Sequence, residues 1–170
     1  NYEAPTALSD DIYGTEISVD GDIYTLPCPV TEFYKNGYEL QYYYDEDYLP
    51  AGQTYYCSLV KEGKELSVHI KNFSDYATSF DNCYVVAVGY DSAYHGDIAY
   101  ETAGGITIGM TEDELVAAFG DLENSLYESD EQNYYYLYEN VWEYSNSRSY
   151  TTTNGILTAI EVSCDKSPVE

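Results

Sequence analysis

Basic residues are scarce in this chain of 170 residues, which has six Lys and Arg against 31 Asp and Glu and a net charge of −25. A protein that binds DNA, RNA or an anionic membrane through phosphate groups needs clustered Lys and Arg. The composition therefore argues against nucleic acid and anionic lipid as direct partners. It favours a hydrated acidic surface, and it is compatible with cationic partners or divalent metal ions.

Long apolar runs are also missing. No segment approaches the ~20 consecutive apolar residues that a membrane-spanning helix needs, so we expect no transmembrane segment in this chain. The only methionine is Met110. We interpret this as the removal of a signal peptide or of a lipoprotein anchor, although a domain boundary chosen by an experimenter would give the same result. We therefore expect a bacterial protein that is extracellular or attached to the cell surface, either secreted or held by a lipid anchor.

Catalytic motifs are absent from the sequence. A GxSxG nucleophile motif does not occur. His69 alternates with Ser67 and Lys71 on an expected strand and should face solvent, and His95 lies in a polar loop. Carboxylates are abundant, but nothing in the sequence places two of them across a cleft, as a glycosidase requires. We predict no catalytic residues and conclude that the chain is not an enzyme.

The cysteines lack the spacing of a metal or redox site, because no CxxC motif occurs. The sequence permits two interpretations, either two disulfides in a secreted chain or four small buried residues with free thiols. Spacing alone does not decide between them, since pairing depends on the folded geometry. The four residues are Cys28, Cys57, Cys83 and Cys164.

Two short acidic segments offer oxygen ligands that would suit calcium. One contains Asp20 and Asp22, and the other contains Asp45, Glu46 and Asp47. Neither segment follows the twelve-residue loop of an EF-hand. We interpret both as polar turns and predict no metal site and no cofactor.

The clearest structural signal in the sequence lies in residues 104–120, GGITIGMTEDELVAAFG. Thr111 is a good helix N-cap, and Glu114 can complete a capping box with it. Gly120 is placed to end the helix in a left-handed conformation. An apolar stripe at helical spacing is formed by Leu115, Val116, Ala118 and Phe119. We predict a helix of two to three turns, which must dock on a sheet because an isolated helix of this length is marginal in water.

Strands are expected on the C-terminal side of this helix. Residues 134–138 are rich in β-forming side chains, and residues 148–153 and 156–162 flank Asn154 and Gly155. An Asn-Gly pair between two such runs predicts a tight hairpin. Strict alternation on the last strand would place Ile156, Thr158, Ile160 and Val162 on one face and Leu157, Ala159 and Glu161 on the other.

The N-terminal part of the chain shows a similar order of signals. Residues 16–26 contain Asp20 and Gly21, which predict a hairpin. Residues 29–36 read as a short helix that begins at a proline. Several antiparallel strands follow, and residues 83–90, CYVVAVGY, are the segment with the most buried character.

The region 101–165 resembles the helix-plus-sheet unit of the SmpA/OmlA outer-membrane lipoproteins, and it is similar to the repeat unit of the β-lactamase inhibitor proteins. The resemblance is carried by Gly109-Met110-Thr111, Glu114-Leu115, Phe119-Gly120 and Asn154-Gly155-Ile156-Leu157. In those families the unit is a binding scaffold and not an enzyme. In the β-lactamase inhibitor proteins two units join edge to edge, their helices cover one face of the sheet, and the other face is a concave binding surface.

The order of elements and this resemblance together predict an α+β fold. We expect two helix-plus-antiparallel-sheet units in tandem, with the helices on one face of the sheet. The expected organisation is a flexible N-terminal tether over residues 1–13, a first unit over 14–99, a second unit over 100–165 and a C-terminal tail over 166–170.

Tyrosine is the most informative residue type, since the chain contains 23 of them. On the strand 134–138, Tyr135 and Leu137 lie on the face opposite to the other tyrosines, so both faces are apolar or amphipathic. We expect about half of the tyrosines to fill the core and the others to form a binding face, because a tyrosine has an apolar body and a polar tip. The candidate partner-binding residues are Tyr42, Tyr43, Tyr44, Tyr134, Tyr136, Tyr138, Trp142 and Tyr144.

These observations predict a non-enzymatic binding module that uses an aromatic sheet face against a protein or peptide. One version of this hypothesis is inhibition of an enzyme, by analogy with the β-lactamase inhibitor proteins, and this step depends on fold analogy alone. The alternative is a module that binds carbohydrate or the cell wall, where aromatic rings stack on sugars and acids bond their hydroxyl groups.

Overall fold

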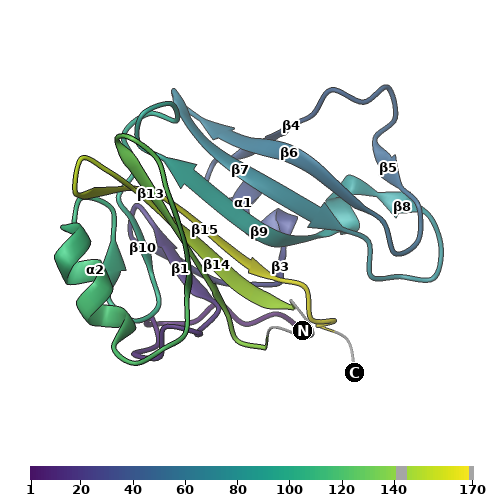
Figure 1. Cartoon of the computed structure of the whole chain (residues 1–170). Helices are drawn as coiled ribbons and strands as arrows, with labels where there is room; N and C mark the ends of the chain where they lie inside the picture. The colour runs from purple at the N-terminus through teal and green to yellow at the C-terminus, as the bar shows by residue number, and fades with distance from the viewer. Residues whose placement is uncertain (141–144, 169–170) are drawn as a thin grey trace.

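The computed structural model of the chain describes residues 1–140 and 145–168 and is dominated by one large antiparallel sheet (Figure 1). Nine strands form this sheet, and β3 (Cys28–Pro29) pairs with β9 outside the main order. The other strands follow one another in the order β12 (Ser125–Glu128), β13 (Gln132–Tyr138), β14 (Asn146–Thr153), β15 (Ile156–Cys164), β9 (Tyr84–Asp91), β7 (Lys64–Lys71), β6 (Thr54–Lys61) and β4 (Glu39–Gln41).

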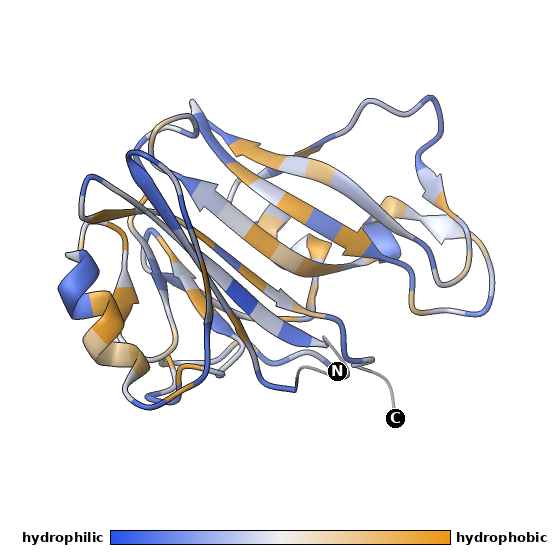
Figure 2. Cartoon of the chain, in the orientation of Figure 1, coloured by the Kyte–Doolittle hydropathy of each residue, from blue (hydrophilic) through white to orange (hydrophobic). Residues whose placement is uncertain are grey.

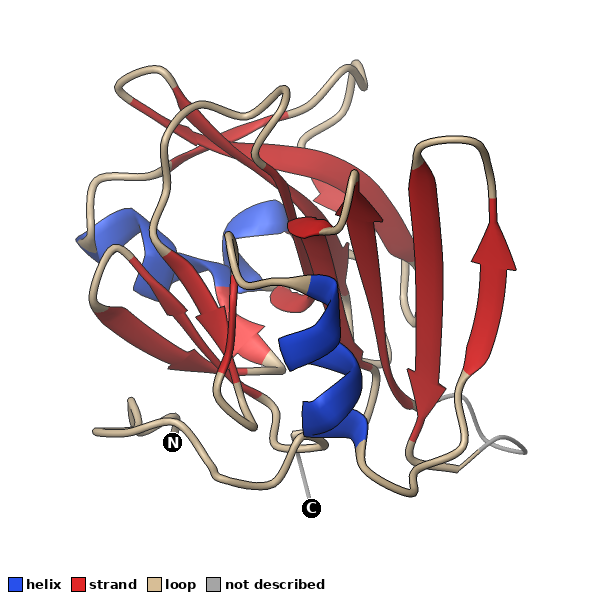
Figure 3. Cartoon of the chain, turned by 60° about the vertical axis from the view of Figure 1, so that its left-hand side comes forward, coloured by secondary structure: helices blue, strands red, loops and turns tan. Residues whose placement is uncertain are grey.

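A second layer covers one face of the large sheet. It contains a four-stranded sheet and two short helices, and Figure 3 shows all of them on the same side. A two-stranded sheet, β5 (Tyr48–Leu49) with β8 (Thr78–Ser79), lies next to the 3-10 helix η1 (Phe80–Asn82). The elements of the second layer are β11 (Ile106–Thr107), β10 (Tyr100–Thr102), β1 (Glu16–Val19), β2 (Asp22–Thr25), α1 (Val30–Lys35) and α2 (Glu112–Phe119).

The predicted α+β class with two tandem helix-plus-sheet units is wrong, because the protein is mostly antiparallel β-sheet with two short helices in the described residues. Segments from both halves of the chain share both sheets. In the small sheet Ile17 of β1 pairs with Thr102 of β10, and in the large sheet Val162 of β15 pairs with Val88 of β9. The prediction failed because capping signals report short-range structure, whereas strand pairing between distant segments depends on which faces the whole fold can bury.

The local predictions are confirmed where they depend on neighbouring residues. Asn154 and Gly155 turn β14 into β15 with φ values of 51° and 80°, as a tight hairpin turn requires. Helix α2 carries the predicted capping box. The Thr111 hydroxyl accepts from the Glu114 amide at 3.1 Å, and the Glu114 carboxylate accepts from the Thr111 amide at 3.3 Å. In Figure 2 the first turn of α2 is hydrophilic and the turns that follow are hydrophobic.

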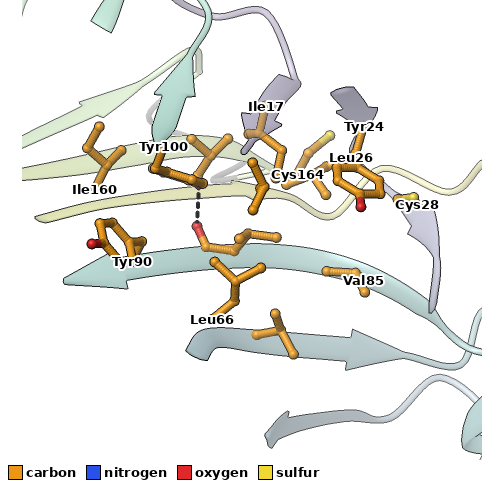
Figure 4. Close-up of a cluster of buried hydrophobic side chains, with 14 of the residues drawn as sticks. Ile17, Tyr24, Leu26, Cys28, Leu66, Val85, Tyr90, Tyr100, Ile160 and Cys164 are labelled. Atoms are coloured by element: carbon orange, nitrogen blue, oxygen red, sulfur yellow. Dashed lines mark hydrogen bonds between the residues drawn. The ribbon is translucent and has the colours of Figure 1, made fainter. Parts of the chain in front are cut away.

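The core lies between the large sheet and the second layer. Helix α2 inserts Phe119, whose ring centroid lies 5.5 Å from those of both Tyr135 and Tyr150. The two sheets are also linked directly. The Tyr100 hydroxyl of β10, in the small sheet, donates a hydrogen bond of 2.9 Å to the Val88 carbonyl of β9, in the large sheet (Figure 4). The predicted docking of the helix on the sheet is thus confirmed. No helix among the described residues is long and apolar enough to span a membrane.

The last strand departs from strict alternation. A register shift opposes Thr151 to Ala159 and Thr152 to Leu157, which places one extra residue in β15. Leu157 is therefore fully buried on the same face of the strand as Ile160, whereas the side chain of Ile156 is 41% exposed. A β-bulge of this kind reverses the inward and outward assignment on one side of the irregularity. The prediction that Ile156 shares the face of Ile160 is wrong for this reason.

Replacing Thr111 by Ala should lower the free energy of unfolding by about 1 kcal/mol, since the N-cap side chain satisfies a helix amide that otherwise has no partner. In a chain of this size that loss corresponds to a decrease of about 2–4 °C in the melting temperature. Differential scanning calorimetry of this variant beside Thr6→Ala, an exposed position on the N-terminal segment, provides the check. Equal melting temperatures for the two variants would contradict the capping role.

Candidate functional site

The face of the large sheet that lies opposite the second layer is here called the open face. Along β7, Leu66, Val68 and Ile70 point into the core, whereas Ser67 and His69 point to the open face. Figure 2 shows this alternation of hydrophobic and hydrophilic residues along β7. Among the described residues, both helices and the small sheet lie against the other face. The open face is consequently the largest part of the sheet that is available to a partner.

Strand register aligns one row of open-face residues across the sheet, which we call the central row. It runs at right angles to the strands, and small side chains occupy most of its positions. A row of serine and glycine leaves the sheet backbone close to the surface and produces a depression between taller side chains. The central row consists of Ser58, Ser67, Gly89, Glu161, Ser149 and Tyr136.

A groove with a volume of about 200 Å³ lies over the middle of the central row. Its floor includes Gly89, Ser149 and the side chain of Glu161. Tyr56 of β6 stands at one end, where its hydroxyl donates to the Ser67 hydroxyl at 3.1 Å. The groove therefore combines an aromatic ring, hydroxyl groups and a carboxylate on a floor of small residues.

The predicted tyrosines of β13 lie on the open face. Tyr134, Tyr136 and Tyr138 share it, and the ring centroid of Tyr127 from β12 lies 5.8 Å from that of Tyr134. Tyr135, on the opposite face, is buried. The predicted division of this strand into two faces is confirmed. We call the four residues Tyr127, Tyr134, Tyr136 and Tyr138 the tyrosine stripe; their role in binding remains a prediction.

The tyrosines after β4 lie elsewhere. The Tyr42 ring meets the ring of buried Phe80 edge-on, with centroids 4.8 Å apart, and the Tyr44 centroid lies 4.2 Å from that of Tyr55. Tyr43 projects from this loop and is 90% exposed. Strand β4 is at the opposite end of the sheet from β12 and β13. The two predicted groups of tyrosines therefore do not form one site. Trp142 and Tyr144 lie outside the described residues.

Sequence reasoning missed the groove residues Tyr56, Gly89 and Glu161. The alternation along residues 55–60 could have predicted the outward position of Tyr56. Neighbouring side chains on a strand point to opposite faces, and Cys57 is buried. Gly89 and Glu161 come together only because β9 pairs with β15 in this register. No short-range pattern predicts that pairing.

His95 is held at the rim of the groove by the loop after β9. Its Nδ1 accepts from the Asp91 amide at 3.2 Å, so Nε2 carries the proton of the neutral ring, and Nε2 lies 3.6 Å from a carboxylate oxygen of Glu65. Both ring nitrogens therefore have neighbours within the protein. In residues 1–140 and 145–168, no group of three or more His, Cys, Asp or Glu side chains is arranged to hold a metal ion.

All four cysteines are buried with free thiols, which resolves the choice that the sequence left open in favour of the unpaired state. Burial raises the pKa of the Cys28 and Cys57 thiols to about 12 and that of Cys83 to about 11. Burial also raises the pKa of the Cys164 thiol. A neutral buried thiol is a poor nucleophile and a poor metal ligand, so these residues act as small core side chains.

No protein family, curated protein or solved structure matches the chain. The resemblance to the SmpA/OmlA lipoproteins and the β-lactamase inhibitor proteins thus depends on the short motifs alone.

Proposed function

We propose that this chain is a non-catalytic binding module that receives a protein or peptide partner on the open face. The observation that carries the proposal is the tyrosine stripe next to a groove with a floor of small residues, on a face that the second layer leaves uncovered. A depression bordered by rigid amphipathic rings permits close contact with a partner and offers hydroxyl groups for hydrogen bonds.

The tyrosine stripe supports a protein partner for a second reason. Exposed tyrosine side chains lose little conformational entropy on binding, since only two torsion angles must be fixed. Tyr127 and Tyr136 are both exposed and lie diagonally opposite each other across β12 and β13. Exposed tyrosines in this arrangement suit a protein partner, because the energetically dominant contacts of protein interfaces are enriched in tyrosine.

The proposal predicts that peptides selected by this protein depend on the tyrosine stripe. A random peptide library displayed on phage would be selected against the wild type, and the affinities of the enriched peptides measured by calorimetry. The double variant Tyr127→Ser, Tyr136→Ser should bind them about 30-fold more weakly or worse, because removal of dominant aromatic contacts costs 2 kcal/mol or more. The control is Tyr48→Ser, Tyr76→Ser, which removes two exposed tyrosines elsewhere.

Equal affinities for the two double variants would contradict the proposal. If the enriched peptides instead lost affinity for Tyr43→Ser, the site would lie at the loop after β4. Retention of the wild type on a polysaccharide array, with no enrichment of peptides, would favour the carbohydrate alternative over a protein partner. Circular dichroism and melting temperature would establish that each variant is folded.

A further inference from the structure

The side chain of Glu161 lies across the bare backbone of Gly89 in the middle of the groove. The two residues are directly paired between β15 and β9. A Cβ atom added to Gly89 would lie 3.4 Å from Oε2 of Glu161 and 3.7 Å from both its Cβ and its Cγ. The added Cβ would be in ordinary van der Waals contact with this side chain, so a residue larger than alanine at position 89 would occupy the depression. Glycine at this point allows the carboxylate to lie low on the sheet surface, within the groove.

The carboxylate of Glu161 has no partner in the part of the chain that the structure describes. Within residues 1–140 and 145–168 no hydrogen bond or ion pair reaches it, and the residues that line the groove include neither lysine nor arginine. Glu161 is thus an unmatched negative charge within a preformed depression.

The six basic residues of the chain are all engaged elsewhere. Four lysines form ion pairs with other acids, Lys61 lies over the Tyr38 ring at 5.6 Å, and the Arg148 guanidinium is buried against main-chain carbonyls. The ion pairs are Lys35 with Glu32, Lys64 with Asp20, Lys71 with Asp165 and Lys166 with Glu139. A cation that neutralises Glu161 must therefore come from outside the described residues.

The walls of the groove complete a site for such a cation. Tyr56 is 58% exposed, and its bond to Ser67 holds the ring beside the groove. An aromatic ring attracts a cation near its face, and a carboxylate accepts charge-assisted hydrogen bonds from it. On the other side of Glu161, Ser149 and Thr151 supply hydroxyl groups that can accept from further N–H donors.

We propose that the groove binds one basic side chain of the partner, with the guanidinium of an arginine as the best fit. The planar guanidinium has five N–H donors, so it can bond to the carboxylate and the hydroxyl groups while it stacks on the Tyr56 ring. The net charge of −25 favours the approach of a basic segment. The inference rests on the proposed function and specifies the chemistry of the partner at one position.

The test uses amide proton–nitrogen correlation spectra of the full chain during titration with Nα-acetyl-arginine amide. The amides of Ser67, Gly89 and Ser149 should shift and saturate at millimolar ligand. Glu161→Gln, which keeps the shape of the side chain, should weaken this binding at least about tenfold. Glu131→Gln, at the exposed turn between β12 and β13, should leave it unchanged. The corresponding citrulline amide, which is neutral but nearly the same shape, should give no saturable shift.

Three results would overturn the inference. The first is equal shifts with the arginine and citrulline amides, and the second is an unchanged dissociation constant in Glu161→Gln. The third is saturable shifts of the same amides with methyl glucoside and none with the arginine amide, which would reassign the groove to a sugar. The proposed function fails in a different way, if the library peptides bind Tyr127→Ser, Tyr136→Ser as tightly as they bind Tyr48→Ser, Tyr76→Ser. If the library peptides depend on the tyrosine stripe but bind Glu161→Gln normally, the binding face is right and the basic side chain is wrong.

Discussion

Replacing Arg148 by Met is expected to lower the free energy of unfolding by about 3–5 kcal/mol, because it removes several hydrogen bonds to buried neutral acceptors at once. Arg148 points from β14 into the core and is only 2% exposed. Its guanidinium donates to the main-chain carbonyls of Ile12, Tyr13 and Gly14 and to the side-chain oxygen of Asn146. Methionine would fill similar space and leave these acceptors without a donor, at about 1–3 kcal/mol for each buried group.

The hydrogen bonds from Arg148 also hold the N-terminal segment against the rest of the protein. Ile12 belongs to the hydrophobic core, and the Gly104 amide donates to the Ser9 carbonyl at 2.9 Å. Without the Arg148 side chain, the segment before β1 should detach more readily. Limited proteolysis of Arg148→Met should therefore cleave near residues 9–14 faster than in the wild type.

Urea unfolding of Arg148→Met beside Lys166→Met would separate this effect from a simple loss of charge, because the Lys166 side chain is largely exposed and forms only a surface ion pair. The melting temperature of the arginine variant should fall by about 2–4 °C for each kcal/mol lost. A stability within 1 kcal/mol of the control, with unchanged proteolysis, would mean that water replaces the guanidinium at these carbonyls.

Cys28 and Cys57 are expected to be alkylated about a thousandfold more slowly in the native protein than in the unfolded chain, and Cys83 about a hundredfold more slowly. At about pH 8 roughly one thiol in ten is ionised when its pKa is near 9, against roughly one in ten thousand at a pKa near 12. Burial raises the pKa of the Cys28 and Cys57 thiols to about 12 and that of the Cys83 thiol to about 11. Burial also blocks direct access of the reagent to all four sulfur atoms.

The measurement is the rate of iodoacetamide labelling, followed by mass spectrometry of the intact chain with and without urea and without reductant. Four labels should appear quickly in urea and almost none in the native state. Rapid native labelling would contradict the burial, and fewer than four labels in urea would reveal a disulfide. A cysteine in a short unfolded peptide, whose thiol has an ordinary pKa, is labelled in the same reaction and provides the reference rate.

These thiols also make the free energy of unfolding depend on pH in the alkaline range. Because their pKa values are higher in the folded state than in the unfolded state, their contribution is fully present below pH 9 and is lost as the pH rises from about 9 towards 12. The buried hydroxyl of Tyr24, whose pKa is raised to about 12, acts in the same direction.

Part of the candidate site could be predicted from the sequence, and part could not. Alternation along β13 correctly separated Tyr134 and Tyr136 from buried Tyr135, because side chains on a strand point to opposite faces with a period of two. The groove could not be predicted from the sequence. Gly89 and Glu161 are separated by more than seventy residues in the chain, and they meet only through the pairing of β9 with β15.

The sequence by itself determined the structures that involve neighbouring residues. The capping box between Thr111 and Glu114 and the turn at Asn154 and Gly155 depend on hydrogen bonds and backbone angles within a few residues, so composition and spacing suffice to predict them.

Only the tertiary structure decided which strands pair. It joined β1 to β10 in the small sheet, introduced the bulge that buries Leu157 in place of Ile156, and left one face of the large sheet uncovered. These outcomes follow from the register that buries the most apolar surface between the two layers. That quantity belongs to the whole chain, and no segment contains it.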